Sequence, residues 1–325
     1  MENWFTVEKI DTDTFAISEY KHWEETHCYL LCGTEKAILI DTGLGVSNIK
    51  TVVCNLTKLP ITVITTHVHW DHIGGHKYFD SIAVHKAEQE WLSCHFPIPL
   101  QVVKHNLICK PCDFPIDFVI DDYQLYNGVP DLVFNDGYSF DLGNRQLTVI
   151  HTPGHSPGHC CFYEADRQYL YSGDLIYMGC LNAFYPTTNP QQFYQSVKKV
   201  KGLRIERVLP SHHQLSIPVC IIDRIEKAFC ELEKQGNLEQ GKGVFNFGDF
   251  QIHIWKSKST NYDGGLKLEI DWIKCPICGG KTHNKVREDT EMKNFPLFCP
   301  KSKKETLIDV KNLTMTVYKD FFGKW

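Results

Sequence analysis

Residues 65–76 read T-T-H-V-H-W-D-H-I-G-G-H, a stretch that concentrates four histidines and one aspartate. Imidazole nitrogen and carboxylate oxygen are both good ligands for Zn²⁺. The run I-T-V-I-T-T predicts a strand leading into this stretch, and residues two apart on an extended chain face the same way. His67 and His69 can therefore address one metal ion, whereas Asp71 and His72, after a turn, can address a second. One such histidine alone is usually a core or surface residue, but four ligand-type side chains at this spacing predict a metal centre.

Further ligand-type side chains follow other β-type runs later in the chain. They come from the turn H-T-P-G-H-S-P-G-H, from S-G-D and from L-P-S-H-H. Each of these motifs taken alone is usually only a turn, but together they offer a convergent set of loops. Spacing leaves open which of their histidines belong to the centre. The candidates are His151, His155, His159, Asp174, His212 and His213.

These motifs, in this order and with I-D-T-G-L-G upstream, resemble the metallo-β-lactamase-fold hydrolase superfamily over roughly residues 10–250. The resemblance implies a first metal ion held by His67, His69 and His155 and a second held by Asp71, His72 and His212. It also implies that Asp174 bridges the two ions and that Asp41 supports the site from behind the ligands.

The resemblance implies a hydrolase in which hydroxide bridged between two zinc ions attacks the substrate, while the ions polarise its carbonyl or phosphoryl oxygen. A protein nucleophile is then unnecessary, and none of the 14 cysteines lies in a recognisable Cys/His nucleophile motif. Asp71 is expected to steer the hydroxide or to move a proton. Tyr177, in S-G-D-L-I-Y, could donate to the oxyanion or simply pack at the edge of the sheet.

Differences between branches of the superfamily narrow the substrate. Asp174 stands where the commonest zinc β-lactamases have cysteine, and His69 stands where the diiron oxygen-reducing branch has glutamate. A β-lactam drug and redox iron are therefore disfavoured. The block at 136–156, together with S-G-D-L-I-Y, is similar to a small animal subgroup known for acyl-CoA hydrolysis. We expect a small-molecule ester or thioester as substrate, with an acyl-CoA-type thioester or a lactone favoured.

Two other functions stay open. A nuclease of the same superfamily would share the ligands and act on RNA, but it needs a basic groove for phosphates. The chain carries a net charge of −5, and only residues 271–325 are mildly basic, with 11 Lys/Arg against 7 Asp/Glu. A nucleic-acid partner is therefore not expected. The other alternative is a non-catalytic metal-binding protein that docks through its C-terminal domain.

Predicted strands interleaved with helices position these motifs. The periodicity predicts strands at 15–18, 28–32, 37–41, 61–66, 146–151, 159–164, 169–173 and 207–210. It predicts helices at 46–56, at 87–94, after Asn189-Pro190 and over about 219–235. The pattern is compatible with the α/β fold that the resemblance implies, a four-layer αββα arrangement of two mixed sheets covered by helices. We assign residues 1–255 to this hydrolase domain.

Residues 95–130 lack a clean period and are rich in proline, histidine and aromatics, which is typical of a substrate lid or insert. Its apolar side chains could line an acyl pocket or belong to ordinary core. They are Phe96, Leu100, Phe114, Phe118 and Tyr123.

A second domain is expected at 271–325, after a polar linker at 256–270. Its C-P-I-C-G-G-K-T-H and F-C-P-K-S motifs resemble the cysteine-rich KTR domain, which reads as a small zinc-ribbon-like β domain with one structural Zn²⁺. Two positions depart from that pattern, since Ser302 replaces the fourth cysteine and His283 replaces the arginine. The remaining ligands would be Cys275, Cys278 and Cys299, completed by His283 or water, unless the site is degenerate.

The start of the chain shows no signal peptide, and no apolar run is long enough to span a bilayer. Together with cysteines suited to burial or metal ligation, these features favour a cytoplasmic protein, and the KTR resemblance favours a bacterial one. Cys109 and Cys112 form another C-x-x-C pair, to which we assign a structural role. A homo-oligomer is compatible with the sequence.

Overall fold

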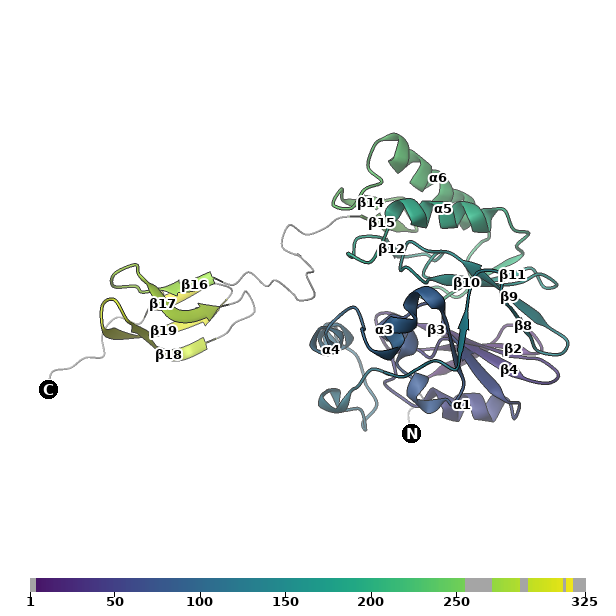
Figure 1. Ribbon diagram of the computed structural model, residues 1–325, viewed down its shortest axis with the longest axis horizontal. Coiled ribbons are helices and arrows are strands. Elements are labelled where there is room, and N and C mark those ends of the chain that lie inside the picture. The colour runs from purple at the N-terminus through teal and green to yellow at the C-terminus, as the bar shows by residue number, and fades with distance from the viewer. Residues whose placement is uncertain (1–3, 255–270, 287–291, 312–313, 318–325) are drawn as a thin grey trace. The chain divides into compact units, whose positions relative to one another are not determined.

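The computed structural model describes residues 4–254, 271–286, 292–311 and 314–317 (Figure 1). The chain divides into two compact units, Met1–Lys256 and Ser257–Trp325. Within the described ranges, no helix combines the length and the apolar character needed to cross a bilayer.

A seven-stranded mixed sheet forms the N-terminal half of the first unit. Its strands follow one another in sequence order: β1 (Thr6–Lys9), β2 (Thr14–Ser18), β3 (His27–Cys32), β4 (Ala37–Ile40), β5 (Ile61–Ile64), β6 (Ile82–His85) and β7 (Leu132–Phe134). The pairs from β1 to β4 are antiparallel, and those from β4 to β7 are parallel. The parallel strands therefore all end at the same edge of the sheet.

A second, five-stranded sheet follows. Its order is β13 (Arg207–Pro210), β11 (Tyr169–Gly173), β10 (Cys160–Glu164), β9 (Gln146–His151) and β8 (Ser139–Asp141). All its pairs are antiparallel except β11 with β13. A small third sheet has the order β12 (Cys180–Asn182), β15 (Gln251–His253) and β14 (Val244–Asn246).

The helices of the first unit fall into two groups. The N-terminal half contains α1 (Ile49–Leu56), α2 (Trp70–Ile73), α3 (Gln89–Ser93) and α4 (Leu100–Ile108), and three short 3₁₀ turns, η1 (His76–Tyr78), η2 (Lys86–Glu88) and η3 (Ile120–Asp122). The C-terminal half contains α5 (Pro190–Lys201) and α6 (Ile221–Lys234). Figure 1 shows α1 outside one large sheet and α5 and α6 outside the other.

Three hydrophobic clusters give the four layers their order. Alternate side chains of β3 separate to opposite faces of the first sheet, because residues two apart on a strand share a face. Tyr29 and Leu31 join Val149 and Phe162 of the second sheet in the central cluster. Cys28 and Leu30 face the outer cluster with α1. A third cluster packs the outer face of the second sheet against α5 and α6. The expected αββα fold is thus confirmed.

Residues 95–130 differ from the sequence expectation, because they include the helix α4. Only Val103 and Leu107 of its nine residues are buried, so the apolar stripe is too short to give a clear period. All five apolar residues singled out in this segment pack against the outer cluster of the first sheet. These contacts favour the core alternative for them, and a role of the segment as a lid stays a prediction.

The second unit contains two small antiparallel sheets. One is the hairpin of β16 (Asp271–Lys274) and β17 (Lys281–Val286). The other has the order β18 (Met292–Cys299), β19 (Lys304–Lys311) and β20 (Thr314–Val317). The expected small C-terminal β domain is therefore present.

Candidate metal centre

The predicted ligands of the first unit come from loops that follow strands at one edge of both large sheets. His67 and His69 follow β5, and Asp71 and His72 lie on the single turn of α2. His155 lies between β9 and β10. Asp174 comes directly after β11, and His212 comes two residues after the end of β13. Strands that end at a common edge bring residues together that are far apart in sequence.

The loop that carries His155 depends on a glycine. Gly154 has φ +135°, a conformation that side-chain-bearing residues rarely adopt, and an added Cβ would lie 2.2 Å from the backbone nitrogen of Phe193 in α5. The loop can therefore lie directly against the start of α5 only with glycine at this position.

One group of imidazoles meets at the end of β5. His67 Nε2 lies 2.9 Å from His69 Nδ1, and His155 Nε2 lies 3.0 Å from the same nitrogen. Their ligand atoms lie within 4.8 Å of one another. These three histidines are the ones that the family resemblance implies for the first metal ion.

A second group forms around His72. Its Nε2 lies 3.2 Å from His212 Nε2, and Asp71 Oδ2 lies 3.5 Å from His212 Nε2. Asp174 stands between the two groups, because its Oδ1 lies 3.2 Å from Nε2 of His72 and its Oδ2 lies 3.4 Å from Nε2 of His155. The two carboxylate oxygens thus face different groups, as a bridging ligand would require.

Hydrogen bonds from the far side of the rings orient three of the histidines. Nδ1 of His72 donates to Asp41 Oδ2 at 2.8 Å, and Nδ1 of His155 donates to the Asn182 carbonyl at 3.1 Å. Nδ1 of His212 donates to the Glu24 carbonyl at 2.8 Å. Each ring therefore directs its Nε2 toward the centre, which is the usual arrangement of metal-binding histidines.

Asp41 lies behind the ligand side chains, as the family resemblance implies for a supporting carboxylate. Its oxygens also accept the backbone N–H of Thr66 at 2.8 Å and the Thr66 hydroxyl at 2.6 Å. Asp41 itself has φ +58°, an unusual conformation for a residue other than glycine. The side chain thereby ties the loop after β4 to the loop after β5 and to His72.

Burial and neighbouring charges lower the pKa values of some of these histidines and raise those of others. Burial and neighbouring imidazoles hold the pKa values of His67 and His69 well below the ordinary value. Burial also disfavours a charged His212, but the Asp174 carboxylate outweighs it and raises the pKa of His212 to about 10. The pKa of His72 is raised in the same way. Although burial alone would raise the pKa of Asp174, the histidines around it hold that pKa well below its usual range.

Sequence reasoning missed Glu88, a buried carboxylate that joins two ligand loops. One oxygen accepts the backbone N–H of Val68, between His67 and His69. The other accepts the backbone N–H of Gly158 at 2.8 Å, in the loop that carries His155. Burial raises the pKa of Glu88. Nothing in A-E-Q-E at 87–90 distinguishes this glutamate from an ordinary helix residue, so the sequence held no signal for it.

His159, one of the open candidates, supports Asp174 instead of joining the two groups. Its Nε2 accepts the backbone N–H of Asp174 at 2.9 Å, and its Nδ1 donates to the Thr152 carbonyl at 3.1 Å. Gly173, with φ +51°, leaves room for this ring, because an added Cβ would lie 2.5 Å from His159 Nε2. His159 therefore fixes the position of Asp174 through the backbone.

The other histidines lie apart from these groups. His151 Nε2 donates to the Pro157 carbonyl, and His213 Nδ1 lies 3.1 Å from a Glu25 carboxylate oxygen. His76, the fourth histidine of the stretch 65–76, is fully buried in η1. Its two ring nitrogens lie 2.7 Å and 2.9 Å from the hydroxyls of Thr42 and Thr65. His76 therefore joins the loops after β4 and β5.

Tyr177 lies beside the centre, with its ring centroid 5.7 Å from that of His212. Its hydroxyl donates a short hydrogen bond to the Cys180 carbonyl. A hydroxyl proton engaged in this way favours the packing alternative for Tyr177, and its role as an oxyanion donor stays a prediction.

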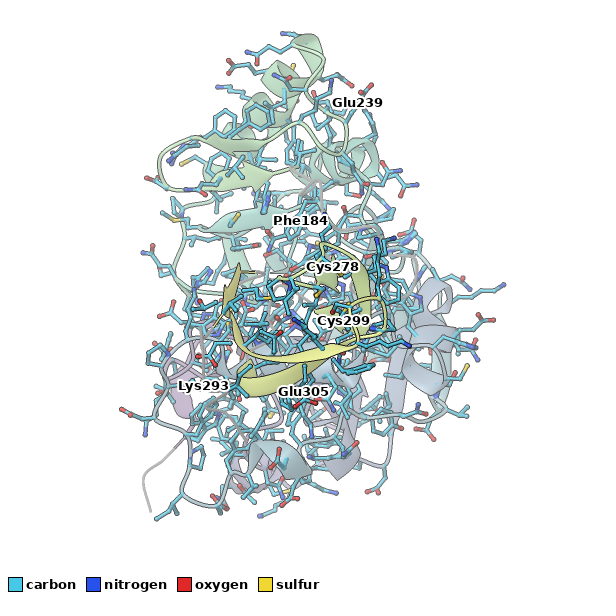
Figure 2. All side chains as sticks on the ribbon, turned by 90° about the vertical axis from the view of Figure 1, so that its left-hand side faces the viewer. Phe184, Glu239, Cys278, Lys293, Cys299 and Glu305 are labelled. Carbon is cyan, nitrogen blue, oxygen red and sulfur yellow. The ribbon has the colours of Figure 1, made fainter. Side chains whose placement is uncertain are left out.

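The predicted C-terminal ligands also lie together. The sulfur atoms of Cys275, Cys278 and Cys299 are all within 4.8 Å of one another, and Figure 2 shows Cys278 beside Cys299. Ser302 lies next to them, and its side-chain hydrogen bond helps to lower the pKa of the Cys299 thiol to about 6. The side chain of His283, named above as a fourth ligand, lies outside the part of the chain that the structure describes.

The donor set of the first unit fits divalent cations such as Zn²⁺. Asp174 Oδ1 is a buried oxygen without a hydrogen-bond partner, although Nε2 of both His72 and His212 lies 3.2 Å away. Imidazole nitrogens that face one another at 3 Å or so need a shared proton or a cation between them. Nitrogen and carboxylate oxygen are the donors that zinc accepts in open catalytic sites. The seven side chains could therefore hold two ions.

We expect zinc affinity at this centre to fall as the pH falls. With a pKa of about 10, His212 carries a proton at neutral pH, as does His72, and zinc must displace both. For each proton that zinc must displace, the apparent zinc affinity falls by about tenfold when the pH falls by one unit. Competition with a chromophoric chelator at pH 6, 7 and 8 measures this slope, in a chain with Cys275, Cys278 and Cys299 all replaced by serine, so that the C-terminal cysteines do not contribute. A pH-independent affinity would show that the histidines are not protonated.

Comparisons with known proteins agree with this architecture. A family model described as the metallo-beta-lactamase superfamily matches residues 23–212. A second model, described as cysteine-rich KTR, matches residues 270–321. The two matches cover different parts of the chain, in the order expected from the sequence.

Individual relatives and one solved structure are also similar. The chain is 31% identical over 230 residues to the acyl-coenzyme A thioesterase MBLAC2 of Bos taurus, an alignment that covers 64% of this chain and 81% of the relative. It is 24% identical over 196 residues to a hydroxyacylglutathione hydrolase of Salmonella typhi, covering 60% of this chain and 64% of the relative. The FEZ-1 metallo-beta-lactamase from Legionella gormanii shares the fold, with a TM-score of 0.51, 19% identity, and coverage of 73% and 98%.

Proposed function

The chain belongs to the metallo-beta-lactamase superfamily and carries a C-terminal cysteine-rich KTR domain, and from that premise we propose that it is a zinc-dependent thioester hydrolase. The favoured substrate class is an acyl-CoA-type thioester. The observation that carries the proposal is the meeting of two ligand groups at Asp174, one carboxylate oxygen facing each group.

Two zinc ions would supply the reactive chemistry, because bound zinc lowers the pKa of water and polarises a carbonyl oxygen. We assign His67, His69 and His155 to one ion and Asp71, His72 and His212 to the other, with Asp174 shared. Asp41, Glu88 and His159 then keep these side chains in place through the hydrogen bonds described above. Such supporting contacts normally affect metal affinity as well as activity.

We assign to Asp71 the role of accepting the proton that the attacking water gives up. It is largely buried, and its Oδ2 lies between 3.5 and 3.8 Å from Nε2 of His212 and of His72. A carboxylate in that position can accept a proton from the attacking water. Hydrolysis of a thioester needs no general acid to protonate the leaving group. The departing thiol has an ordinary pKa of about 8.5, so it leaves readily as thiolate.

The relatives support a thioester over an oxygen ester. By name, one acts on acyl-coenzyme A and the other on hydroxyacylglutathione. In both compounds the acyl group is carried on sulfur. The aspartate at position 174 is also consistent with this class, because cysteine would be expected there in the commonest zinc β-lactamases.

Apolar side chains of the 95–130 segment support an acyl group in the substrate. Ile108, Ile116, Val119 and Val129 are exposed there, and we expect them to contact the acyl chain. The segment also reaches the loop before β3, because His22 Nε2 donates to the Leu107 carbonyl at 2.9 Å. Two residues further along that loop, Glu24 accepts the hydrogen bond that orients His212.

A substrate panel tests the proposal. We expect the zinc-loaded chain to release free thiol from acyl-CoAs, with kcat/KM at least about a hundredfold above that for a lactone or β-lactam. Thiol release is followed with a thiol-reactive dye, and chelator-treated protein serves as the control. Cleavage of short RNA without any thioester turnover would instead support the nuclease alternative. Metal binding without turnover of any substrate would support the non-catalytic one.

Cellular location and assembly stay predictions. We propose a cytoplasmic, bacterial protein that acts on a small-molecule substrate, and a homo-oligomer remains compatible with this function.

A further inference from the structure

Two loops of the C-terminal unit share one backbone construction. The first reads Cys-Pro-Ile-Cys from Cys275 and the second reads Cys-Pro-Lys-Ser from Cys299. In the first, the Cys275 carbonyl accepts the N–H of Gly279 at 2.9 Å, and in the second the Cys299 carbonyl accepts the N–H of Lys303 at 2.8 Å. Both donors are left-handed, with φ 65° at Gly279 and 53° at Lys303. Lysine rarely adopts this conformation, so the second loop forms the same turn as the first despite an unfavourable backbone conformation at Lys303.

The leading sulfur of each loop also accepts a backbone N–H from its own loop. Ile277 donates to Cys275 Sγ at 3.4 Å, and Ser302 donates to Cys299 Sγ at 3.4 Å. Hydrogen bonds of this kind stabilise the thiolate form of sulfur, which is the form that binds metal.

The two loops face each other, and their four ligand-type side chains meet in pairs. Cys278 Sγ lies 3.6 Å from Cys299 Sγ, and Cys275 Sγ lies 3.6 Å from Ser302 Oγ. These sulfurs are unbonded thiols, since a disulfide would bring two of them to about 2.0 Å. Four ligands at 2.3 Å from a tetrahedral centre would lie about 3.8 Å apart. The observed spacing is close to that value.

The unit also needs a further link between its two sheets. Cys275 and Cys278 lie in the turn between β16 and β17, whereas Cys299 ends β18 in the other sheet. Among the described residues, only Ile273, Leu297, Ile308 and Val310 form the fully buried core. A core of this size usually requires a metal ion or disulfides for stability.

We propose that Cys275, Cys278 and Cys299 bind one structural Zn²⁺ as thiolates, with the Ser302 hydroxyl oxygen as the fourth ligand. Binding releases the thiol protons to solvent. The site is distinct from the centre of the first unit, which offers only nitrogen and oxygen, and it does not depend on the proposed hydrolase function. Because an oxygen from serine is a poorer zinc ligand than thiolate, the ion exchanges faster than in a four-cysteine site.

Cobalt substitution of the full chain tests this site by itself. Co²⁺ bound to thiolate gives a near-ultraviolet sulfur-to-metal absorption band, and the nitrogen and oxygen ligands of the first unit give none. We expect the native chain to show the band. Because its intensity follows the number of thiolates, Ser302→Cys should raise it by about one third, from three to four, and Cys278→Ser should lower it by about one third or abolish it. Ser302→Cys should also slow the loss of zinc to a chelator.

Cys109→Ser provides the matched control, because Cys109 belongs to the C-x-x-C pair of the first unit. Its band should equal that of the native chain. Absence of the band from the native chain would overturn the proposal. So would a band that persists in Cys278→Ser but disappears in Cys109→Ser. An unchanged band in Ser302→Cys, measured on protein with a native circular dichroism spectrum, would exclude Ser302 as the fourth ligand.

Discussion

An Asp174→Ala chain is expected to lose both metal ions of the first unit together and to lose at least about a thousandfold in kcat/KM. The carboxylate faces both ligand groups, so its removal weakens both positions at once. The loss of a shared anionic ligand removes several kcal/mol of charge stabilisation, and about 4 kcal/mol corresponds to a thousandfold in rate. Native mass spectrometry counts the ions, and thiol release from an acyl-CoA gives the rate.

The control for this change is Asp166→Ala, which removes an exposed aspartate from the turn between β10 and β11. It should keep its metal ions and its rate. Retention of both metal ions by Asp174→Ala would show that the carboxylate does not bridge them. Loss of one ion alone would assign Asp174 to a single position.

Glu88→Ala is expected to weaken both the fold and the metal centre, although Glu88 belongs to neither ligand group. The substitution leaves the buried N–H groups of Val68 and Gly158 without an acceptor. At about 1–3 kcal/mol for each of the two unsatisfied groups, the free energy of unfolding should fall by roughly 2–6 kcal/mol. Zinc affinity should fall by about 10–100-fold, because the loops that carry His67 and His155 lose their common support.

Thermal unfolding of the metal-free chain and chelator competition separate these two effects. Glu90→Ala is the matched control, because Glu90 is an exposed glutamate two residues away on the same segment. A Glu88→Ala chain with native stability and native zinc affinity would show that the two loops hold their positions independently.

The residues that meet in the two groups could be predicted from sequence because each lies in a short motif after a β-type run. His67, His69, Asp71 and His72 occupy one continuous stretch, and the structure brings the other three to it in the expected groups. Spacing alone did not choose among the histidines of 151–159. That choice came from the family resemblance, and in the structure His155 joins a group while His159 supports Asp174.

The supporting residue Glu88 and the helix α4 could not be predicted, for a different reason. Glu88 acts on a loop 70 residues away, and a contact of that separation leaves no local pattern. The helix α4 buries only two of its nine residues, so it lacks the apolar periodicity by which helices are predicted from sequence. Strands were easier, because their alternation is strong. The strands expected at 146–151, 169–173 and 207–210 have those bounds in the structure.

The most direct measurement of the central claim is a zinc titration of metal-depleted protein, with thiol release from an acyl-CoA as the readout. A chain with Cys275, Cys278 and Cys299 all replaced by serine is used, so that only the centre of the first unit takes up zinc. We predict no thiol release before zinc is added and full turnover when two equivalents are bound. Full turnover with one or no bound ion, or none with both ions bound, would contradict the assignment of a two-zinc thioester hydrolase.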